Sequence, residues 1–562
     1  IGHQIGFSRL LSVGNKADIN EADLLPALAA DPNTRVILLY LEDVKDGPRF
    51  LPALRAATAI KPVLVLKMGR TSSGQVATAS HTGALAGAHE AFRAACQQAG
   101  AIEVERVQTL FNAAIALAYQ PLPRGNRIAI LSNAGGPAAV AADAFEAAGL
   151  QMARPGPETQ AVLRTFLHPD AQVGGPVDML GGADETHYLR SLSALLADPG
   201  IDGVLTILVP QSLIKPLAVV EAWRQAIAGQ SRPPKPVLAC LMGEASVREA
   251  RTAAHAAEIP PYSFPEEAVE AFSILWRRAQ LVEKREAAQR CSGAAAQIGE
   301  GQEIVIAEGR GSTQGETIIG ARPQAEVQRA IAAALEAGRF QMDAIEARPL
   351  LTAYGIPTAG EGLATTPDEA AALAERIGFP VVMKLISPDI LHKTEAGGVI
   401  LNIRSAQEAR AAFETLLERG RAARPAARIR GVQVQQMIVG GQEVIVGVKR
   451  DPTFGPLVMF GLGGIYVELL ADVSFRLAPL TEDDAWEMLA EVRSAKLLAG
   501  VRGAAPADRA ALVDAIVRIG RLAADHPQIA ELDVNPLLVL PQGRGVVAVD
   551  ARAVLRPQAP PV

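Results

Sequence analysis

Short apolar segments alternate with helical segments over the first half of this chain, and one succession of them occurs twice. In the first copy, apolar segments at 35–42 and 61–69 flank a helical segment at 47–60. In the second copy, the corresponding apolar segments lie at 202–210 and 235–243. In both copies a helix, a short strand and a closing helix follow. Such spacing is typical of parallel α/β domains, so the sequence predicts one α/β domain present in two copies.

The two copies differ at their start. The second copy opens with a strand, a glycine turn and a helix at 126–150, and the first copy has no counterpart. We therefore expect residues 1–122 to be a domain that lacks its first strand and helix, as in a fragment of a longer chain. Residues 286–339 include a polar, glycine-rich stretch, "GEGQEIVIAEGRGSTQGET", and are predicted to be a linker.

The composition argues against several classes of protein. The formal net charge is -6, from 54 basic and 60 acidic residues, so a basic surface for nucleic acid is not expected. No uninterrupted apolar run approaches about 18 residues, so neither a membrane-spanning helix nor a membrane partner is predicted. The three cysteines, Cys96, Cys240 and Cys291, are too widely spaced for a disulfide framework or a metal site. They favour a reducing, cytoplasmic location, and no signal-peptide pattern opposes it.

His81 lies in the stretch "ATASHTGALAG" (77–87), between the end of an apolar strand and a helix rich in glycine and alanine. Ser80 or Thr82 can cap that helix, which places His81 at a helix N-terminus. The positive end of the helix dipole keeps the imidazole neutral and nucleophilic, and the free N–H groups there can hold a phosphate. These properties suit a phosphorylated histidine. The alternative is a histidine near a helix cap without any function.

Glu42 ends an apolar strand at the carboxyl edge of the first predicted sheet, where α/β proteins place their sites. His81 follows a later strand of the same sheet, so the Glu42 carboxylate could accept one imidazole N–H and leave the other nitrogen free to attack. The alternative is a solvated charge at a strand end. In the second copy the matching strand ends in "ILVP", and no histidine follows in "LMGEASVREA". Any chemistry is therefore confined to the first copy.

Gly135 and Gly136 lie in "SNAGGPAAVA" (132–141), a turn from a strand into a helix. Such a turn can present backbone N–H groups to an anion, and we expect a phosphate-binding helix end there. The alternative is a tight turn that uses two glycines for its geometry alone.

A third unit begins near residue 340 and carries charged residues among apolar ones. Lys384 lies in the apolar strand "VVMKL", where an unpaired ammonium is costly, so an anionic partner is expected. The polar loop "SPDILHKTEAGGV" contains His392 and ends in Gly397–Gly398. Glu443 follows a turn in "VQQMIVGGQEVIVGVKRD". The alternative for Lys384 is a side chain that extends along the sheet to reach solvent.

Asn535 of "VNPL" and Asp550 of "VVAVDAR" are predicted on neighbouring strands near the end of the chain. Two hard oxygen ligands suit Mg²⁺ that is bound mainly through substrate phosphates. The alternatives are a turn residue before Pro536 and a charge at a strand end. The whole set, in this order, is hard to explain by structure alone.

These motifs resemble the acyl-CoA synthetases (NDP-forming), the superfamily of ADP-forming acetate–CoA ligase and succinyl-CoA synthetase. The motifs "GNKADIN", "YLE" and "ASHTGALAG" look like the flavodoxin-like ligase domain of that family, "SNAGGPA" and "GGPVDML" like its second ligase domain, and "MKLISPDILHKTEAGGV" like its ATP-grasp domain. The resemblance implies an α/β protein with this organisation: a truncated flavodoxin-like ligase domain at 1–122, a second one at 123–285, a linker at 286–339 and an ATP-grasp domain at 340–562.

The resemblance also implies roles for the candidate residues. His81 is the phosphohistidine that exchanges phosphate with the acyl group, Glu42 stabilises it, and His392 relays phosphate on a mobile loop. The other implied sites are ATP at Lys384, Glu443, Gly397 and Gly398, phosphate at Gly135 and Gly136, and Mg²⁺ at Asn535 and Asp550. Two features depart from the family pattern. The CoA-binding Rossmann domain expected ahead of residue 1 is missing, and the usual "NPVD" reads "GPVD", with Gly175 in place of asparagine.

The activity that follows is the reversible, ATP-dependent joining of a small carboxylic acid to CoA, with release of ADP and phosphate. An acyl phosphate and the two phosphohistidines are its expected intermediates, Mg²⁺ is its expected metal, and a homo-oligomer is the expected assembly. The alternative is the ligase-like regulatory part of a protein lysine acetyltransferase. The presence of His81 together with Glu42 favours catalysis.

Overall fold

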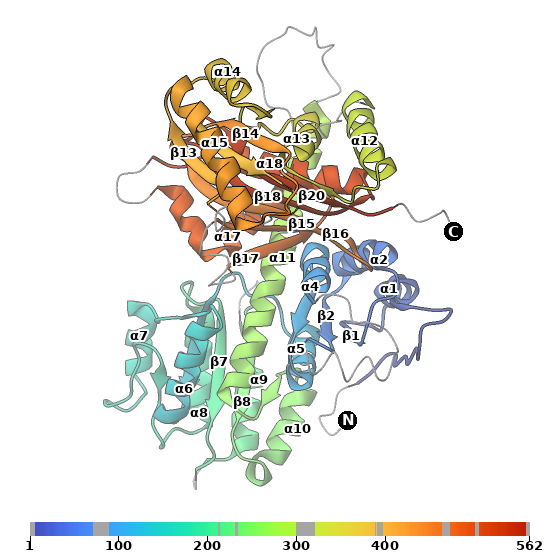
Figure 1. Cartoon of the computed structure of the whole chain (residues 1–562). Coiled ribbons are helices and arrows are strands. Elements are labelled where there is room, and N and C mark those ends of the chain that lie inside the picture. The colour runs from blue at the N-terminus through green and yellow to red at the C-terminus, as the bar shows by residue number, and fades with distance from the viewer. Residues whose placement is uncertain are drawn as a thin grey trace. The chain divides into compact units, whose positions relative to one another are not determined.

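The computed structural model describes residues 6–70, 89–211, 214–230, 234–298, 321–387, 389, 397–463, 472–500 and 505–557. The chain divides into two compact units (Figure 1). The first comprises 1–86 with 99–310, and the second comprises 87–98 with 311–562. None of the described helices is long and apolar enough to cross a membrane.

The first copy of the repeated domain is built on a three-stranded parallel sheet in the order β1-β2-β3. Every residue of β2 is buried, as expected for a strand of a parallel sheet. Asn20 and Asp46 begin the first two helices by accepting hydrogen bonds from backbone N–H groups of the first turn. The elements are α1 (Glu21–Ala30), β1 (Ile37–Leu41), α2 (Gly47–Ile60), β2 (Val63–Lys67), α4 (His89–Ala99), β3 (Ile102–Val104) and α5 (Val107–Tyr119).

The second copy is built on a six-stranded parallel sheet in the order β5-β4-β7-β8-β9, with β6 paired to β4. One face of this sheet packs against α7, α8, α9 and α10, and α6 and α11 pack against the other. The elements are β4 (Arg127–Ser132), α6 (Gly135–Ala147), β5 (Gln151–Met152), α7 (Pro157–Arg164), β6 (Val177–Asp178), α8 (Glu185–Ala197), β7 (Gly203–Leu208), α9 (Pro216–Ala228), β8 (Val237–Leu241), α10 (Arg248–Ala256), β9 (Pro261–Tyr262) and α11 (Pro265–Ile298).

The two copies share one order of elements. The succession β1–α2–β2–α4–β3–α5 matches β7–α9–β8–α10–β9–α11. Within the described residues of the first copy, no strand corresponds to β4. Part of the stretch predicted to be a linker is helical, because α11 continues to Ile298 and α12 spans Ala321–Glu336. Val327, Ile331 and Ala334 of α12 are buried in the core of the second unit, and this packing stabilises the helix.

The second unit contains two antiparallel sheets. The smaller has the order β11-β14-β12-β13, and α14 and α15 pack against one of its faces. In β14, Val432 and Val434 on that face alternate with Gln433 and Gln435 on the other. The elements are β11 (Glu361–Ala364), α14 (Pro367–Ile377), β12 (Val381–Ile386), β13 (Val399–Ile403), α15 (Ala406–Ala423) and β14 (Gly431–Gln436).

The larger sheet has seven strands in the order β10-β20-β18-β15-β16-β17, with β19 paired to β18. Residues of α12, α13, α17 and α18 form a single apolar core with this sheet. Its elements are β10 (Gln341–Met342), α13 (Ala344–Ala353), β15 (Gln442–Asp451), β16 (Gly455–Leu462), β17 (Val473–Leu477), α17 (Glu482–Glu491), α18 (Arg509–Asp525), β18 (Ile529–Val539), β19 (Val546–Ala548) and β20 (Ala551–Leu555).

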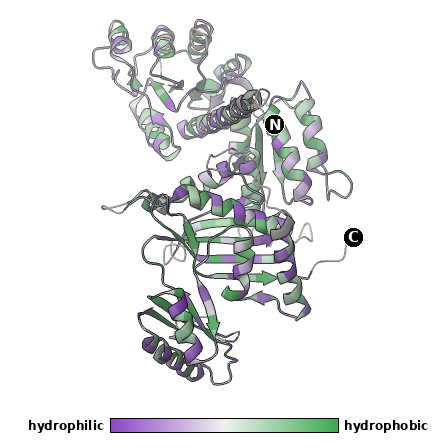
Figure 2. Ribbon diagram, turned by 90° about the horizontal axis from the view of Figure 1, so that it is seen from above, coloured by the Kyte–Doolittle hydropathy of each residue, from purple (hydrophilic) through white to green (hydrophobic). Residues whose placement is uncertain are grey.

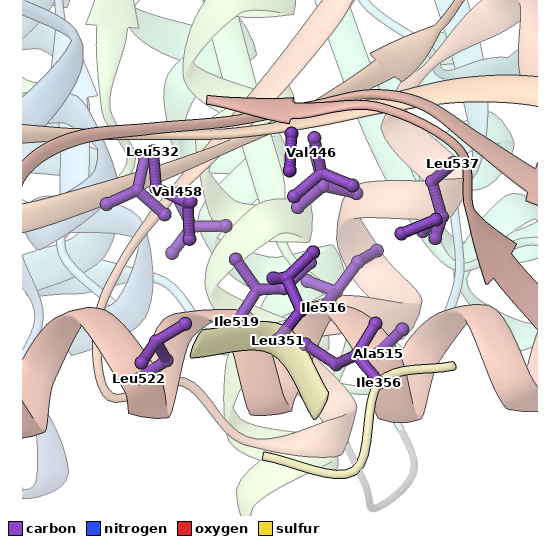
Figure 3. Close-up of a cluster of buried hydrophobic side chains, with 14 of the residues drawn as sticks. Leu351, Ile356, Val446, Val458, Ala515, Ile516, Ile519, Leu522, Leu532 and Leu537 are labelled. Carbon is purple, nitrogen blue, oxygen red and sulfur yellow. The ribbon is translucent and has the colours of Figure 1, made fainter. Parts of the chain in front are cut away.

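Hydrophobic residues are concentrated in the strands of both units, whereas the helices alternate between hydrophobic and hydrophilic positions (Figure 2). Figure 3 shows the centre of the larger core, where Ile516 and Ile519 of α18 extend toward Val446 and Val458 of the sheet. This core fixes the strands of the larger sheet from one side, and therefore also fixes the residues at their ends.

Candidate functional site

Asn535 and Asp550 lie beside each other where the ladder between β18 and its neighbours is interrupted. The sequence predicts one strand over "GVVAVDAR", but the structure divides it into β19 and β20, with Val549 and Asp550 in the break. The backbone N–H of Asn535 donates to the Asp550 carbonyl at 3.1 Å, and that of Val549 donates to the Pro536 carbonyl at 3.0 Å. The two predicted metal ligands are therefore neighbours, as the sequence analysis expects.

Lys384 of β12 reaches the same place from the smaller sheet. Its side chain is only 11% exposed, and its Nζ lies 3.9 Å from Oδ2 of Asp550. The anionic partner expected from the sequence is thus, in part, a carboxylate from the other sheet of the same unit. An ammonium beside a carboxylate in a site of low exposure is suited to bind a phosphate and its cation together.

A second carboxylate strengthens the negative charge around Asp550. Asp533 precedes Asn535 by two residues on β18, so their side chains share a face of the sheet. Asp533 is exposed on this face, but partial desolvation by the surrounding atoms, and then the nearby charge of Asp550, raise its pKa, whereas the opposite Arg552 lowers it. Repulsion between two carboxylates favours a divalent cation near them. A carboxamide oxygen and a carboxylate oxygen are hard ligands that fit Mg²⁺, and the described residues hold no richer cluster of His, Cys, Asp and Glu.

The polar face of the smaller sheet carries residues that the motif analysis missed. Lys384 is paired in register with Gln433 of β14, and Glu361 of β11 is paired with Gln435. Both glutamines donate from Nε2 to Oε2 of Glu361, each at 2.7 Å. Burial raises the pKa of Glu361, against the opposing effect of these hydrogen bonds and of the Lys384 charge. The alternation in "VQVQQ" is the sequence signal that could have revealed two glutamines on one face.

The remaining ATP-site candidates lie on both sheets. Gly398 accepts a hydrogen bond at its carbonyl from the Leu385 N–H at 2.8 Å, which holds the start of β13 beside Lys384. Gly397 has φ +64°, a conformation that favours glycine. Glu443 is exposed near the start of β15 and is paired in register with Leu538 of β18. Their roles in binding ATP stay predictions.

His81 and His392 lie outside the described residues, so the pairing of Glu42 with His81 also stays a prediction. Glu42 is exposed directly after β1, at the carboxyl edge where the sequence places it. Its backbone carbonyl accepts a hydrogen bond from Nζ of Lys67, at 2.5 Å, and Lys67 is the last residue of β2. Lys67 thus joins the ends of β1 and β2 and fixes the backbone from which the Glu42 side chain extends.

Gly135 and Gly136 form the first turn of α6, and both are exposed. The residue before the helix, Ala134, supplies no side-chain cap, so the first N–H groups of α6 have no capping side chain. A Cβ on Gly136 would meet nothing within 4 Å, whereas one on Gly135 would lie 3.0 Å from Asp178. The turn can therefore admit an anion at Gly136, although phosphate binding there stays a prediction.

Gly175, the departure from "NPVD", has φ +92°, and a Cβ at this position would lie 2.8 Å from the Ala153 carbonyl oxygen. A non-glycine residue cannot occupy this conformation without displacing the backbone of Ala153. In this chain the glycine is therefore required by the local structure of the second sheet.

Three family models match the chain in succession. They are a succinyl-CoA ligase-like flavodoxin domain at residues 2–117, a ligase-CoA domain at 128–283 and an ATP-grasp domain at 333–555. These matches, with the two parallel-sheet domains and the two-sheet unit that follows them, confirm the predicted fold class. They define a class of enzyme in which two CoA-ligase domains precede a domain that binds ATP.

Three relatives show which kind of CoA ligase the chain resembles. The ADP-forming acetate–CoA ligase I of Archaeoglobus fulgidus is 41% identical over 552 residues, which are 98% of this chain and 74% of that ligase. The ADP-forming 4-hydroxybutyrate–CoA ligase of Nitrosopumilus maritimus is 35% identical over 98% of this chain and 74% of its own length. A trans-feruloyl-CoA synthase from an unknown prokaryotic organism is 31% identical over 97% of this chain and 72% of its own length. The chain belongs to the ADP-forming acid–CoA ligases of the NDP-forming acyl-CoA synthetase superfamily.

Proposed function

We propose that this chain carries out the acid–CoA ligation of its family by dividing the work between its units. The ATP-grasp unit binds the nucleotide at Lys384 and transfers its γ-phosphoryl group to His392. His81 then receives the phosphoryl group and passes it to the carboxylate of the acid. The observation that carries the proposal is the meeting of Lys384, Asn535 and Asp550 between the two sheets of one unit.

The chemistry balances without an oxidant or reductant. A nitrogen of His392 attacks the γ-phosphorus and ADP leaves. A nitrogen of His81 then attacks that phosphorus and displaces His392, and the acid's carboxylate oxygen finally displaces His81 to form an acyl phosphate. The CoA thiol loses its proton and attacks the acyl carbon, and phosphate leaves. Every step is reversible, so the same residues can make ATP from an acyl-CoA, ADP and phosphate. Positioning and charge neutralisation supply most of the rate enhancement in such phosphoryl transfers.

We assign the metal to Asn535 and Asp550. Mg²⁺ held there would neutralise charge on the nucleotide phosphates, and its small number of protein ligands leaves positions for phosphate oxygens and water. Lys384 supplies a positive charge from the opposite sheet. Glu42 would orient His81 by accepting one imidazole N–H, which leaves the other nitrogen as the nucleophile.

The acid itself is a small carboxylic acid, and its identity is an open part of the proposal. The named relatives act on acetate, 4-hydroxybutyrate and a feruloyl group, so the family tolerates aliphatic, hydroxylated and aromatic acids. A mixture of acids with CoA and ATP, followed by mass spectrometry of the acyl-CoA products, would identify the preferred one.

Labelling with γ-³²P-ATP tests the order of the two histidines. The label should be acid-labile and base-stable, as expected for phosphohistidine. His392→Asn should abolish it, and His81→Asn should leave most of it, because His81 is downstream of ATP in this scheme. Loss of label in His81→Asn with retention in His392→Asn would instead show that His81 meets ATP directly.

Thermal unfolding tests the nucleotide site independently of the histidines. Mg-ATP at 100 times its dissociation constant should stabilise the wild type by about 2.7 kcal/mol. Lys384→Ala should lose most of this increment, whereas Lys449→Ala, which alters an exposed lysine of β15, should keep it. Equal stabilisation of wild type and Lys384→Ala would contradict the assignment of Lys384.

A further inference from the structure

Gln433 and Gln435 lie on the polar face of the smaller sheet and are almost fully buried, at 0% and 1% exposure. Each donates from Nε2 to the same oxygen of Glu361, Oε2. The amide oxygens of both glutamines are buried without a hydrogen-bond partner. Leaving such acceptors unsatisfied costs free energy. The orientation of the two amides is therefore set by the hydrogen bonds that their Nε2 groups donate, and not by any that their oxygens accept.

Only Gln435 makes a second contact of this kind. Its Nε2 also donates to the backbone carbonyl of Val549 at 2.7 Å. Val549 directly follows β19 of the larger sheet and precedes Asp550 in the break between β19 and β20. Gln435 therefore joins the smaller sheet to the backbone that carries the candidate metal ligand.

Backbone hydrogen bonds hold both this break and Ala548 directly before it, which bonds to Pro357 and Ala359. Val549 donates its N–H to the Pro536 carbonyl, and the Asp550 carbonyl accepts from the Asn535 N–H, so both residues bond to the continuous strand β18. The Asp550 carboxylate also accepts from the N–H of Ala551 at 2.9 Å. The hydrogen bond from Gln435 comes from the other sheet and holds the Val549 carbonyl.

We propose that Gln435 is a positioning residue for Asp550, and that Glu361 fixes Gln435 in the orientation this requires. The chain of contacts runs from Glu361 through Gln435 to Val549, and so to the carboxylate that lies 3.9 Å from Lys384. The proposal rests on the assignment of Asn535 and Asp550 as Mg²⁺ ligands and extends it to residues of the smaller sheet. Residues that orient metal ligands typically change metal affinity by about 10–100-fold when they are replaced.

Gln433 provides a matched comparison, because it also binds Glu361 but does not contact Val549. Gln435→Met and Gln433→Met remove the same carboxamide from neighbouring positions on one face of one strand. Glu361→Gln keeps an acceptor oxygen for both glutamines, whereas Glu361→Leu removes it. A loss caused by burial or packing alone would affect both methionine variants alike.

Hydrogen exchange of the nucleotide-free full-length chain gives the direct test. Gln435→Met should accelerate exchange of the peptide over 546–551 by about tenfold, which corresponds to about 1.4 kcal/mol. Gln433→Met and Glu361→Gln should leave that peptide close to wild type. Equal acceleration in Gln435→Met and Gln433→Met, or none in either, would overturn the proposal.

Calorimetric titration with ADP, in EDTA and then in excess Mg²⁺, separates the metal from the nucleotide. Gln435→Met and Glu361→Leu should lose about tenfold or more of the affinity gained with Mg²⁺, with metal-free affinity within about twofold of wild type. Glu361→Gln should retain the gain. An unchanged gain in Gln435→Met would overturn the positioning role. A wild type that binds no Mg-ADP would refute the proposed function instead, with the exchange result still deciding the contact between Gln435 and Val549.

Discussion

Replacing Arg476 should destabilise the ATP-grasp unit more than removing an exposed arginine from it. Arg476 of β17 has a fully buried side chain. Its Nη2 lies 2.6 Å from Oε1 of Glu491 and 3.1 Å from Oε2 of Glu487, and its Nη1 lies 3.1 Å from Oε2 of Glu491. Burial disfavours the guanidinium charge, but these carboxylates outweigh it and raise the pKa of Arg476. β17 is the edge strand of the larger sheet, so these contacts fix it to α17.

Arg476→Met removes three hydrogen bonds to carboxylates and leaves Glu491 partly buried without its positively charged partner. Breaking a buried pair costs about 3–5 kcal/mol. Glu491 keeps 36% of its side-chain exposure, so we take the lower end, about 3 kcal/mol. At about 2–4 °C per kcal/mol for a domain of this size, the melting temperature should fall by roughly 6–12 °C.

Arg410→Met is the matched control, because Arg410 and Asp368 form an exposed pair at 2.8 Å with side chains 50% and 86% exposed. It should cost less than about 1 kcal/mol. Differential scanning calorimetry of the full-length chain, with hydrogen exchange over 473–491 as a local measurement, compares the two variants. A double variant, Arg476→Met with Glu491→Met, should recover much of the loss.

The cost of Arg476→Met should also depend on pH. Hydrogen bonds from Arg476 and Ser474 outweigh the effect of burial and lower the pKa of Glu491 from its ordinary 4.5. The stability from this pair is therefore complete above pH 4.5 and is lost as pH falls through the lower folded-state pKa. The difference between wild type and variant should be full at pH 7 and shrink below pH 4.5. A loss no larger than that of Arg410→Met at pH 7 would refute the reasoning.

Two further predictions concern the backbone at Gly175 and the core under the larger sheet. Gly175→Asn should lower the free energy of unfolding by about 1–3 kcal/mol, because it combines a positive φ with a clash against the Ala153 carbonyl. Gly174→Asn should lower it little, because the space around its Cβ is open. Urea unfolding of both variants checks this. Ile516→Ala should cost about 2–5 kcal/mol by opening a cavity under the larger sheet (Figure 3), and Arg521→Ala on the exposed side of α18 should stay within about 0.5 kcal/mol in the same assay.

Much of the fold is predictable from local pattern. The helix expected at 47–60 is α2 (Gly47–Ile60), and the apolar segments at 61–69 and 235–243 contain β2 and β8. The helix α2 has apolar residues at helical spacing and a capping residue, whereas β2 and β8 are short apolar runs bounded by proline and glycine, so local sequence alone indicates all three. The helix α12 was missed because the linker was extended from the glycine-rich stretch before it, although Val327, Ile331 and Ala334 lie at helical spacing and enter the core.

The candidate site is less predictable, since its geometry depends on residues far apart in the sequence. Asn535 and Asp550 could be placed on neighbouring strands from their motifs. The break at Val549 could not, because "VVAVDAR" has an uninterrupted strand pattern. The break depends on the partner strand, where Pro536 has no N–H to donate to the ladder, and on Gln435 in another sheet. Sequence alone gives no reason to connect residues 435 and 549.

The apolar residues on one face of the smaller sheet nevertheless determine which residues lie on the opposite face, where the candidate site is. Val381, Met383 and Leu385 of β12 are buried against α14 and α15, and the alternation of a strand then places Lys384 on the other side. The same holds for β14, where Val432 and Val434 enter that core and place Gln433 and Gln435 beside Lys384. A shift of one residue in either strand would bury a lysine or a glutamine among apolar helices, at a cost that no local preference could offset. Packing on one face thus selects the register that assembles the proposed nucleotide site on the other.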